Sequence, residues 1–449
     1  MKIENIPIKG IIVFLLLCLT LTACGIRGTW TSGEDINLIQ VSDNSDFELI
    51  QTIAPKSAMK VFAGGALEER RFTNINHLTF LKPGIYAISI GDTIRGMRAI
   101  SIYETQKGIT NEAGIAGITD PNFTRVIYDE MQERILWVRH DRNTLFERAP
   151  DELIALNMEL EELWRIHTPH YARAFKGIED LIQAPEHIPF YIVAVEMAND
   201  FYYVVSTNSI RYNVQINPSP ASVTVVYRVD MDGTIVDVFR KENFEFLGMT
   251  IKNDLYVVYG VQVINNRFET IVIFGNQNDI FASEYKLIQA KNIVTHSIVA
   301  NDTLMITGMW HHSVRGVETF ITLIDLNTKS VTKTLDLSQL TRRYEIHVYG
   351  FFYGEDQKQI GLIGTNTRNS NNLGQVDKSI IFIPINENFE VNSIFSIDVG
   401  KFNYADIVHI AIDADALHMV SNNWHITAYQ TRNEVIEFYI SNEQLMSLQ

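Results

Sequence analysis

Residues 151–169 read DELIALNMELEELWRIHTP, and the fold depends on how this stretch is interpreted. Its Leu, Met and Trp residues recur near helical spacing, which indicates one amphipathic helix. The same residues also form two short apolar runs on either side of a polar centre, which is typical of a β-hairpin. Local helix propensity is a weak guide where a repeat sets the context, so the surrounding sequence has to decide.

A recurrent pair of hairpins runs through the chain on both sides of this stretch. The first hairpin of each pair has an apolar strand, a short polar turn and a second apolar strand. Seven segments fit this description: INHLTFLKPGIYAISIGDT, FTRVIYDEMQERILWVRHD, FYIVAVEMANDFYYVVSTN, FLGMTIKNDLYVVYGVQ, IVTHSIVANDTLMITGMW, IHVYGFFYGEDQKQIGLIG and DIVHIAIDADALHMVSNNW. Each is followed by a second hairpin, and residues 151–169 occupy that second slot. We therefore predict strands at residues 153–157 and 162–166.

Two adjacent hairpins per repeat make a four-stranded sheet, and a repeat of about 45–60 residues is typical of a β-propeller blade. The sequence thus predicts an all-β chain in which residues 46–449 form a β-propeller of seven four-stranded blades, with six or eight as alternatives. Residues 47–53 should close the ring by pairing with the C-terminal repeat. A helical insertion is predicted at residues 168–184, with Thr168 as N-cap and Pro185 as stop.

The segment LIALNMELEELWRI resembles the outer-strand repeat of quinoprotein-like and WD40-like propellers. In such propellers a strand ending in an Ala-Leu-Asp-like motif, a turn and a Leu-Trp-Arg/Lys strand lock adjacent blades through the Trp. Matching residues are Ala155, Leu156, Asn157, Leu163 and Trp164, whereas the usual Thr-Gly pair of the turn is absent. The resemblance implies that Trp164 packs between two blades, and it concerns fold much more than function.

The N-terminus has the features of an export signal. Two lysines in MKIENIPIKG precede the apolar run IIVFLLLCLTLTA, which is short for a membrane span but typical of a signal peptide core. The run ends in LTACG, which resembles a bacterial lipobox and implies a diacylglycerol on the thiol of Cys24. We expect a lipoprotein signal peptide at 1–23 and a lipidated flexible tether at 24–45. A plain signal peptide, or an anchor helix that contains Cys, is the alternative.

Acylated Cys24 would tether the chain to the bilayer in the cell envelope, because two acyl chains suffice for stable anchoring. The membrane is either the cytoplasmic membrane, at its outer leaflet, or the outer membrane. Cys18 lies in the signal peptide, so the mature chain keeps no thiol for a disulfide, a metal ligand or a nucleophile. The formal net charge of −16 argues against nucleic acid as a partner.

Aromatic residues at strand ends are the candidate binding residues. Trp310, His311 and His312 follow a predicted inner strand, and Trp424 lies at a similar place in the last repeat. They could form a platform at one mouth of the propeller for a peptide or a glycan. Adjacent histidines point to opposite sides of an extended chain, so they do not chelate one ion together. His409, His418 and His425 share one repeat without a third ligand at diagnostic spacing.

No metal, cofactor or catalytic residue is therefore predicted. The segment Asp230-Met-Asp-Gly233 is interpreted as a hairpin turn, since the chain returns at once to strand alternation instead of supplying further calcium ligands. No G-x-S-x-G, Walker A, G-x-G-x-x-G or H-E-x-x-H motif occurs. The first hypothesis is a monomeric, non-catalytic binding or scaffold lipoprotein for a protein or glycan partner. The alternative is an exported hydrolase or oxidoreductase with its site at the channel mouth.

Overall fold

The computed structural model describes part of the chain, as short segments separated by gaps. These are residues 38–40, 51–53, 57–64, 74–92, 97–104, 107–116, 125–139, 151–167, 191–207, 222–252, 254–264, 267–287, 293–300, 302–312, 316–340, 346–353, 360–369, 376–385, 391, 394–402, 404–412, 416–426 and 431–441. The predicted signal peptide, Cys24 and the predicted helical insertion at 168–184 lie outside the described residues. None of the helices in the described part of the chain is long and apolar enough to cross a membrane.

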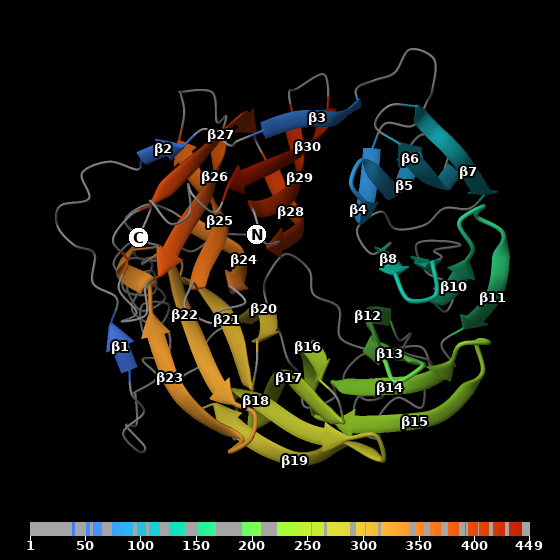
Figure 1. Cartoon of the computed structure of the whole chain (residues 1–449). Coiled ribbons are helices and arrows are strands. Elements are labelled where there is room, and N and C mark those ends of the chain that lie inside the picture. Colours follow the sequence, from blue (N-terminus) through green and yellow to red (C-terminus); the bar gives the residue numbers. More distant parts are fainter. Residues whose placement is uncertain are drawn as a thin grey trace, which may run out of the picture. The chain divides into compact units, whose positions relative to one another are not determined.

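Six blades are each built from four consecutive antiparallel strands (Figure 1). The first three are β4 (Asn74–Lys82), β5 (Ile85–Asp92), β6 (Met97–Glu104) and β7 (Gly108–Ala116); β8 (Arg125–Asp129), β9 (Arg134–Arg139), β10 (Glu152–Leu156) and β11 (Glu162–His167); and β12 (Tyr191–Ala198), β13 (Phe201–Thr207), β14 (Val223–Asp230) and β15 (Ile235–Glu242). The next three are β16 (Glu245–Lys252), β17 (Leu255–Ile264), β18 (Arg267–Asn276) and β19 (Asp279–Leu287); β20 (Ile293–Ala300), β21 (Thr303–His312), β22 (Gly316–Asp325) and β23 (Ser330–Asp336); and β24 (Ile346–Tyr353), β25 (Ile360–Asn369), β26 (Val376–Ile385) and β27 (Phe395–Phe402).

The remaining sheet is composite. The C-terminal repeat supplies three strands, β28 (Tyr404–Ile412), β29 (Ala416–Ile426) and β30 (Thr431–Ser441). The fourth strand is β3 (Ser57–Gly64), which pairs antiparallel with β30. The prediction of seven four-stranded blades is therefore wrong: six blades have four consecutive strands, and the last repeat needs an N-terminal strand to complete its sheet.

Two shorter N-terminal strands also differ from the predictions. β1 (Leu38–Gln40) pairs in parallel with β23, although it lies in the range predicted as a flexible tether. β2 (Gln51–Ile53) pairs in parallel with β27, one blade before the composite sheet. The prediction that residues 47–53 pair with the C-terminal repeat is thus wrong, because β3, farther along the chain, takes that place. The strand partners of β23 and β27 make those two sheets five-stranded.

Residues 152–167 form a hairpin, as predicted. β10 and β11 pair from Glu152 opposite His167 to Leu156 opposite Glu162. The turn closes through a hydrogen bond from the Asn157 amide to the Glu161 carbonyl, at 3.0 Å, and Leu160 has a left-handed backbone with φ of 63°. A helix through residues 151–164 is excluded by this geometry. The repeat therefore outweighed the helical spacing of the apolar residues.

Within residues 36–449 the sheets follow one another around a ring. The first strand of each sheet lies toward the middle in Figure 1, and neighbouring first strands contact each other from β12 through β16, β20, β24 and β28 to β4 and β8. The last step, from the β8–β11 blade to the β12–β15 blade, is bridged by a common hydrophobic cluster that includes Leu136, Val138, Tyr202 and Val204. The ring is therefore closed, which is the defining property of a β-propeller.

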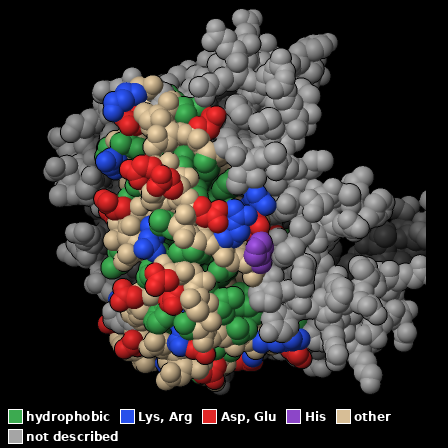
Figure 2. All heavy atoms as spheres, turned by 90° about the vertical axis from the view of Figure 1, so that its right-hand side faces the viewer, with side chains coloured by type: hydrophobic (Ala, Val, Ile, Leu, Met, Phe, Trp, Pro, Cys, Tyr) green, Lys and Arg blue, Asp and Glu red, His purple; other side chains and the backbone are tan. Residues whose placement is uncertain are grey.

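The outer strands carry a mixed, solvated surface. Figure 2 shows the side of the molecule on which β11 and β15 lie, where acidic and basic side chains alternate with small apolar areas. On β15, Val236 and Val238 are exposed next to charged neighbours. Charged side chains on an outer strand discourage pairing with strands of other molecules.

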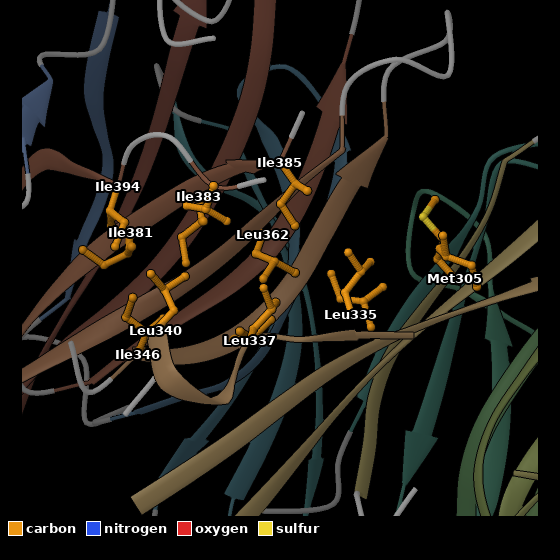
Figure 3. Close-up of a cluster of buried hydrophobic side chains, with 14 residues drawn as sticks. Met305, Leu335, Leu337, Leu340, Ile346, Leu362, Ile381, Ile383, Ile385 and Ile394 are labelled. Carbon is orange, nitrogen blue, oxygen red and sulfur yellow. The ribbon is translucent and has the colours of Figure 1, made fainter. Parts of the chain in front are cut away.

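The core lies between neighbouring sheets. The close-up in Figure 3 shows the cluster between the β20–β23 and β24–β27 blades, in which Leu335 and Leu337 from one blade pack against Leu362 and Ile381 from the next. Similar clusters join other neighbouring pairs. Inner strands such as β9 and β13 are buried over almost their whole length, which explains why they are almost continuously apolar, whereas the outer strands β11 and β15 are largely exposed.

Buried tyrosines reinforce these contacts at one repeated position, the second residue of the second strand. Tyr86 donates from its hydroxyl to Glu437 Oε2 of the composite sheet, at 2.7 Å. Tyr202 donates to Asp129 Oδ2 of the preceding blade at 2.6 Å, and the Tyr256 hydroxyl lies 2.6 Å from that of Tyr203. Each hydroxyl forms its hydrogen bond with the preceding sheet, so these hydrogen bonds hold neighbouring sheets in a fixed relative position.

Candidate functional site

The predicted binding residues lie at strand ends on one face of the ring. Trp310, His311 and His312 are the last three residues of β21, and Trp424 is near the end of β29, opposite Tyr404, the first residue of β28. Because neighbouring sheets have the same strand order, equivalent strand ends lie on the same face. We call this the start face, because the first strand of each blade begins there. The side chains of these four residues, like Cys24, lie outside the described residues.

A second set of residues emerges from the register of the first strands. A β-bulge interrupts the pairing of six first strands with their second strands at one place. The shift lies between Ile75 and His77, Ile192 and Ala194, Phe246 and Gly248, Val294 and His296, Val348 and Gly350, and Ile407 and His409. The residues that follow the bulge in these six blades therefore lie at the same height along the ring axis, and we call this height one level of the ring. Three of these six residues are histidines.

Arg125 occupies the same level on β8. It pairs with Val138, the fifth residue of its second strand, just as His77 pairs with Ser89, the fifth residue of β5. His296 and His409 are likewise opposite the fifth residues of their second strands. We call His77, Arg125, His296 and His409 the inner tier. Three of them, His409, His77 and Arg125, come from consecutive sheets of the ring.

His77 is held as a neutral imidazole. Its Nδ1 accepts a hydrogen bond from the Val126 amide of the next blade, at 3.2 Å. Burial, as the larger cause, and the nearby Arg125 charge together lower the pKa of His77 from 6.5 to about 4. A neutral imidazole that accepts at Nδ1 carries its proton on Nε2, so His77 offers a donor there.

Arg125 is accessible to solvent although protein atoms surround much of its side chain. Its side chain is exposed, yet the surrounding protein disfavours its charge and lowers the pKa of the guanidinium. A residue on an inner strand that lines the axis of a propeller has both properties. One Nη1 hydrogen bond goes to the Val193 carbonyl of the next blade. No carboxylate among the described residues forms an ion pair with Arg125.

Glu196 lies on β12, two residues after Ala194, which occupies the inner-tier level of that blade. The alternation of a strand places both residues on the same side. Burial raises the pKa of Glu196 from 4.5 to about 7. A carboxyl with that pKa can give or take a proton near neutral pH.

A charged network closes the end of the β8–β11 blade at the start face. Glu152 is buried and lies 2.7 Å from Arg139 Nε, 3.3 Å from Arg165 Nη1 and 3.4 Å from His167 Nδ1. Next to it, the Asp151 carboxylate accepts a hydrogen bond from the Ile192 amide of the following blade, at 2.5 Å. Because its charges are paired across β9, β10 and β11, this network holds strand ends together.

The acidic segment Asp230–Gly233 is a hairpin turn, as predicted. Asp230 Oδ1 accepts hydrogen bonds from the amides of Asp232 and Thr234, at 3.0 and 2.8 Å, in the hairpin between β14 and β15. Gly233 has φ of 84°. Across the described part of the chain, no group of three or more His, Cys, Asp or Glu side chains is placed to hold a metal ion.

Sequence reasoning missed the inner tier, although the residue types that form it are visible in the sequence. The seven superimposed first-hairpin segments carry His, Arg, Ala, Gly, His, Gly and His in the corresponding column. Sequence spacing groups His409 with His418 and His425 of its own repeat, whereas its register partners belong to other blades. Position across repeats, and not spacing within one repeat, identifies the residues that share a level.

Comparisons with known proteins support the fold. No protein family model matches the chain, and no curated protein matches it. Among solved structures, the polysaccharide lyase Uly1 is similar with a TM-score of 0.51 and 9% identity, over 86% of this chain and all 100% of that one. The β-propeller domain of the Trilobed protease from Pyrococcus furiosus has a TM-score of 0.46 and 11% identity, over 82% of this chain and 97% of that one. At such identities the likeness concerns the propeller fold alone.

Proposed function

We propose that the chain is an exported, lipid-anchored propeller that binds a protein or glycan partner at its start face without catalysing a reaction. The observation that carries this proposal is the placement of Trp310–His312 and Trp424 at equivalent strand ends on one face. Aromatic residues supply large contact areas at low entropic cost, and they are enriched at binding surfaces. A rigid ring that presents strand ends and loops on one face is a suitable scaffold for such contacts.

The anchor belongs to the same proposal. The lipobox-like LTACG sequence would place a diacylglycerol on Cys24, and the segment up to β1 would connect the membrane to the propeller. A tethered binding module meets its partner at a raised local concentration, so a modest affinity suffices. The cell envelope is therefore where we expect the chain to act.

The test is quantitative co-purification from detergent-solubilised envelopes. Trp310→Ala combined with Trp424→Ala should lower the yield of a specific partner at least about tenfold, since buried aromatic anchors carry much of the energy of an interface. Met131→Ala is the matched control, because Met131 is 86% exposed and lies in the β8–β9 turn on the opposite face. Equal partner yields from the double variant and the control would contradict the proposal.

An exported enzyme is the second candidate, and Glu196 is the observation that favours it. A carboxyl with a pKa of about 7 on an inner strand is suited to general acid or base catalysis. Chromogenic ester, peptide and glycoside probes would test this candidate. Hydrolysis that Glu196→Gln abolishes and the exposed control Glu130→Gln keeps would favour the enzyme, whereas an inactive wild-type chain would disfavour it.

A further inference from the structure

Arg125 has no acidic partner among the described residues. Four other arginines lie within ion-pair distance of a carboxylate: Arg139 with Glu152, Arg165 with Glu162, Arg228 with Asp237 and Arg240 with Glu242. Arg134, like Arg125, donates to a backbone carbonyl instead, that of Met231. In the described region Arg125 donates only to the Val193 carbonyl. An isolated guanidinium that is partly desolvated in a chain of net charge −16 is costly to keep without a compensating anion.

His77 adds a second donor beside this charge. Its Nδ1 is occupied by the Val126 amide, so the proton of the neutral ring lies on Nε2. Within the described residues nothing accepts a hydrogen bond from that atom. Val126 directly follows Arg125, so the two donors of the inner tier are adjacent across two neighbouring blades.

His409 extends the same level on the other side of His77. It occupies the same register position in the composite sheet, whose first strand contacts β4. Three consecutive sheets thus place His, His and Arg at one level next to the ring axis, and the fourth member of the tier, His296, lies two sheets before His409.

We propose that His77 and Arg125 form a binding site for an oxyanion, a carboxylate or a phosphate, beside the axis of the propeller. A planar guanidinium and an imidazole N–H both donate, and charge-assisted hydrogen bonds to carboxylate or phosphate are among the strongest in proteins. A metal ion fits less well, because the Arg125 charge repels a cation and His77 Nδ1 already accepts a hydrogen bond. This site uses residues other than Trp310–His312 and Trp424, although Arg125 begins β8 at the same start face.

Glu196 is the acidic group that could oppose an anion from the neighbouring blade. Burial raises its pKa to about 7, so a substantial fraction of this carboxyl is neutral near pH 7, and the ionised fraction grows as the pH rises. Anion binding should therefore be stronger below pH 7 than above it. His77, with its pKa of about 4, stays neutral in this range and keeps its donor.

Calorimetric titration of the full chain in detergent with inorganic phosphate, and separately with succinate, tests the site. We expect saturable binding of at least one probe. Arg125→Gln should weaken it about tenfold or more through the loss of a charged donor, whereas Arg240→Gln on the outer strand β15 should change it by less than about twofold. Arg125→Lys keeps the positive charge but lacks the planar guanidinium. Its affinity for the probe should lie between those of the wild type and Arg125→Gln, and its melting temperature should equal that of the wild type.

Three results would overturn the proposal. The first is the absence of saturable binding of either probe by the wild-type chain, and the second is equal affinity in the wild type and Arg125→Gln. The third is tight Zn²⁺ binding by chelator-treated protein that His77→Gln abolishes. Partner yield in the Trp310 and Trp424 variants is independent of these titrations, so failure of one proposal can be told from failure of the other.

Discussion

The indole ring of Trp164 lies directly against Gly233, where an added Cβ would come within 2.7 Å of Trp164 Cδ2. Trp164 belongs to β11, the outermost strand of one blade, and Gly233 to the β14–β15 turn of the next blade. Trp164 Nε1 donates to the Met231 carbonyl of that turn at 2.8 Å, and its ring centroid is 5.6 Å from that of Tyr202. A single side chain thus joins two blades at the rim of the ring, as the resemblance of this segment implied.

Trp164→Ala should destabilise the propeller. The change removes a ring that packs against the core between two blades and also removes one of the two hydrogen bonds to the Met231 carbonyl, so we expect a loss of about 3 kcal/mol in the free energy of unfolding. Leu163 is the matched control, because it is 46% exposed on the opposite side of the same strand. Leu163→Ala should cost less than about 1 kcal/mol in urea unfolding, and equal costs for the two variants would rule out this role.

Gly233→Ala should be destabilising for two separable reasons. Its φ of 84° is unfavourable for an L-residue, and the new Cβ would collide with the indole. We expect a cost of about 2 kcal/mol or more in the wild-type background. In the Trp164→Ala background the collision disappears, and only the backbone part should remain. A double-mutant cycle measures this difference, and strict additivity would show that the two residues do not interact.

The strand β3 should stabilise the entire ring and not one sheet. Replacing residues 57–64 by a Gly-Ser linker of equal length uncovers the edge of β30 and opens the composite sheet. The melting temperature should fall by about 5 °C or more in one cooperative transition. The same replacement of β2, residues 51–53, removes only an additional edge strand and should have a smaller effect. An unchanged melting temperature without β3 would contradict closure of the ring by this strand.

The stability of the chain should depend on pH through two opposing groups. The pKa of His77 is lowered on folding from 6.5 to about 4, so its contribution is present above pH 6.5 and is lost as the pH falls toward 4. The pKa of Glu196 is raised from 4.5 to about 7, so its contribution is present below pH 4.5 and is lost as the pH rises toward 7. The two slopes have opposite signs between pH 4.5 and 6.5.

Single variants should separate these slopes. Relative to the wild type, Glu196→Gln should lose more stability as the pH falls from 6.5 to 4.5, because only the His77 term remains. His77→Gln should instead lose more stability as the pH rises over the same range. Urea unfolding at several pH values measures both curves. If the two variants change the slope in the same direction, the assignment of these groups is wrong.

Much of the fold could be predicted from the sequence because each repeat carries the same pattern. The strands predicted at 153–157 and 162–166 agree with β10 and β11 within one residue. Ring closure could not be predicted in the same way. The segments that contain β2 and β3 both read as short apolar strands, and only long-range pairing decides which of them reaches β30.

The inner tier illustrates a different limit. Its residue types are visible in the sequence, but the level they share depends on bulges, which insert a residue into one strand without a clear sequence signal. Arg125 is at the same level with no bulge on its strand. Its lack of an acidic partner in the described region depends on tertiary structure, so only the structure could reveal it.

Lipidation at Cys24 should be the basis of membrane attachment. The lipobox-like sequence offers one thiol for acylation, so Cys24→Ser should abolish metabolic labelling with a radioactive fatty acid. Cys18→Ser is the control, because that residue precedes the expected cleavage site and should leave labelling unchanged. Fatty-acid labelling that persists in the Cys24 variant would refute the lipoprotein interpretation.

Photo-crosslinking tests the central claim, partner binding at the start face, most directly. A benzophenone amino acid would be placed at position 310 or 424, and at position 131 on the opposite face, in the anchored chain in intact envelopes. The account predicts a discrete crosslinked species from positions 310 and 424 and none from position 131. Crosslinking that is absent at 310 and 424, or equal at all three positions, would contradict it.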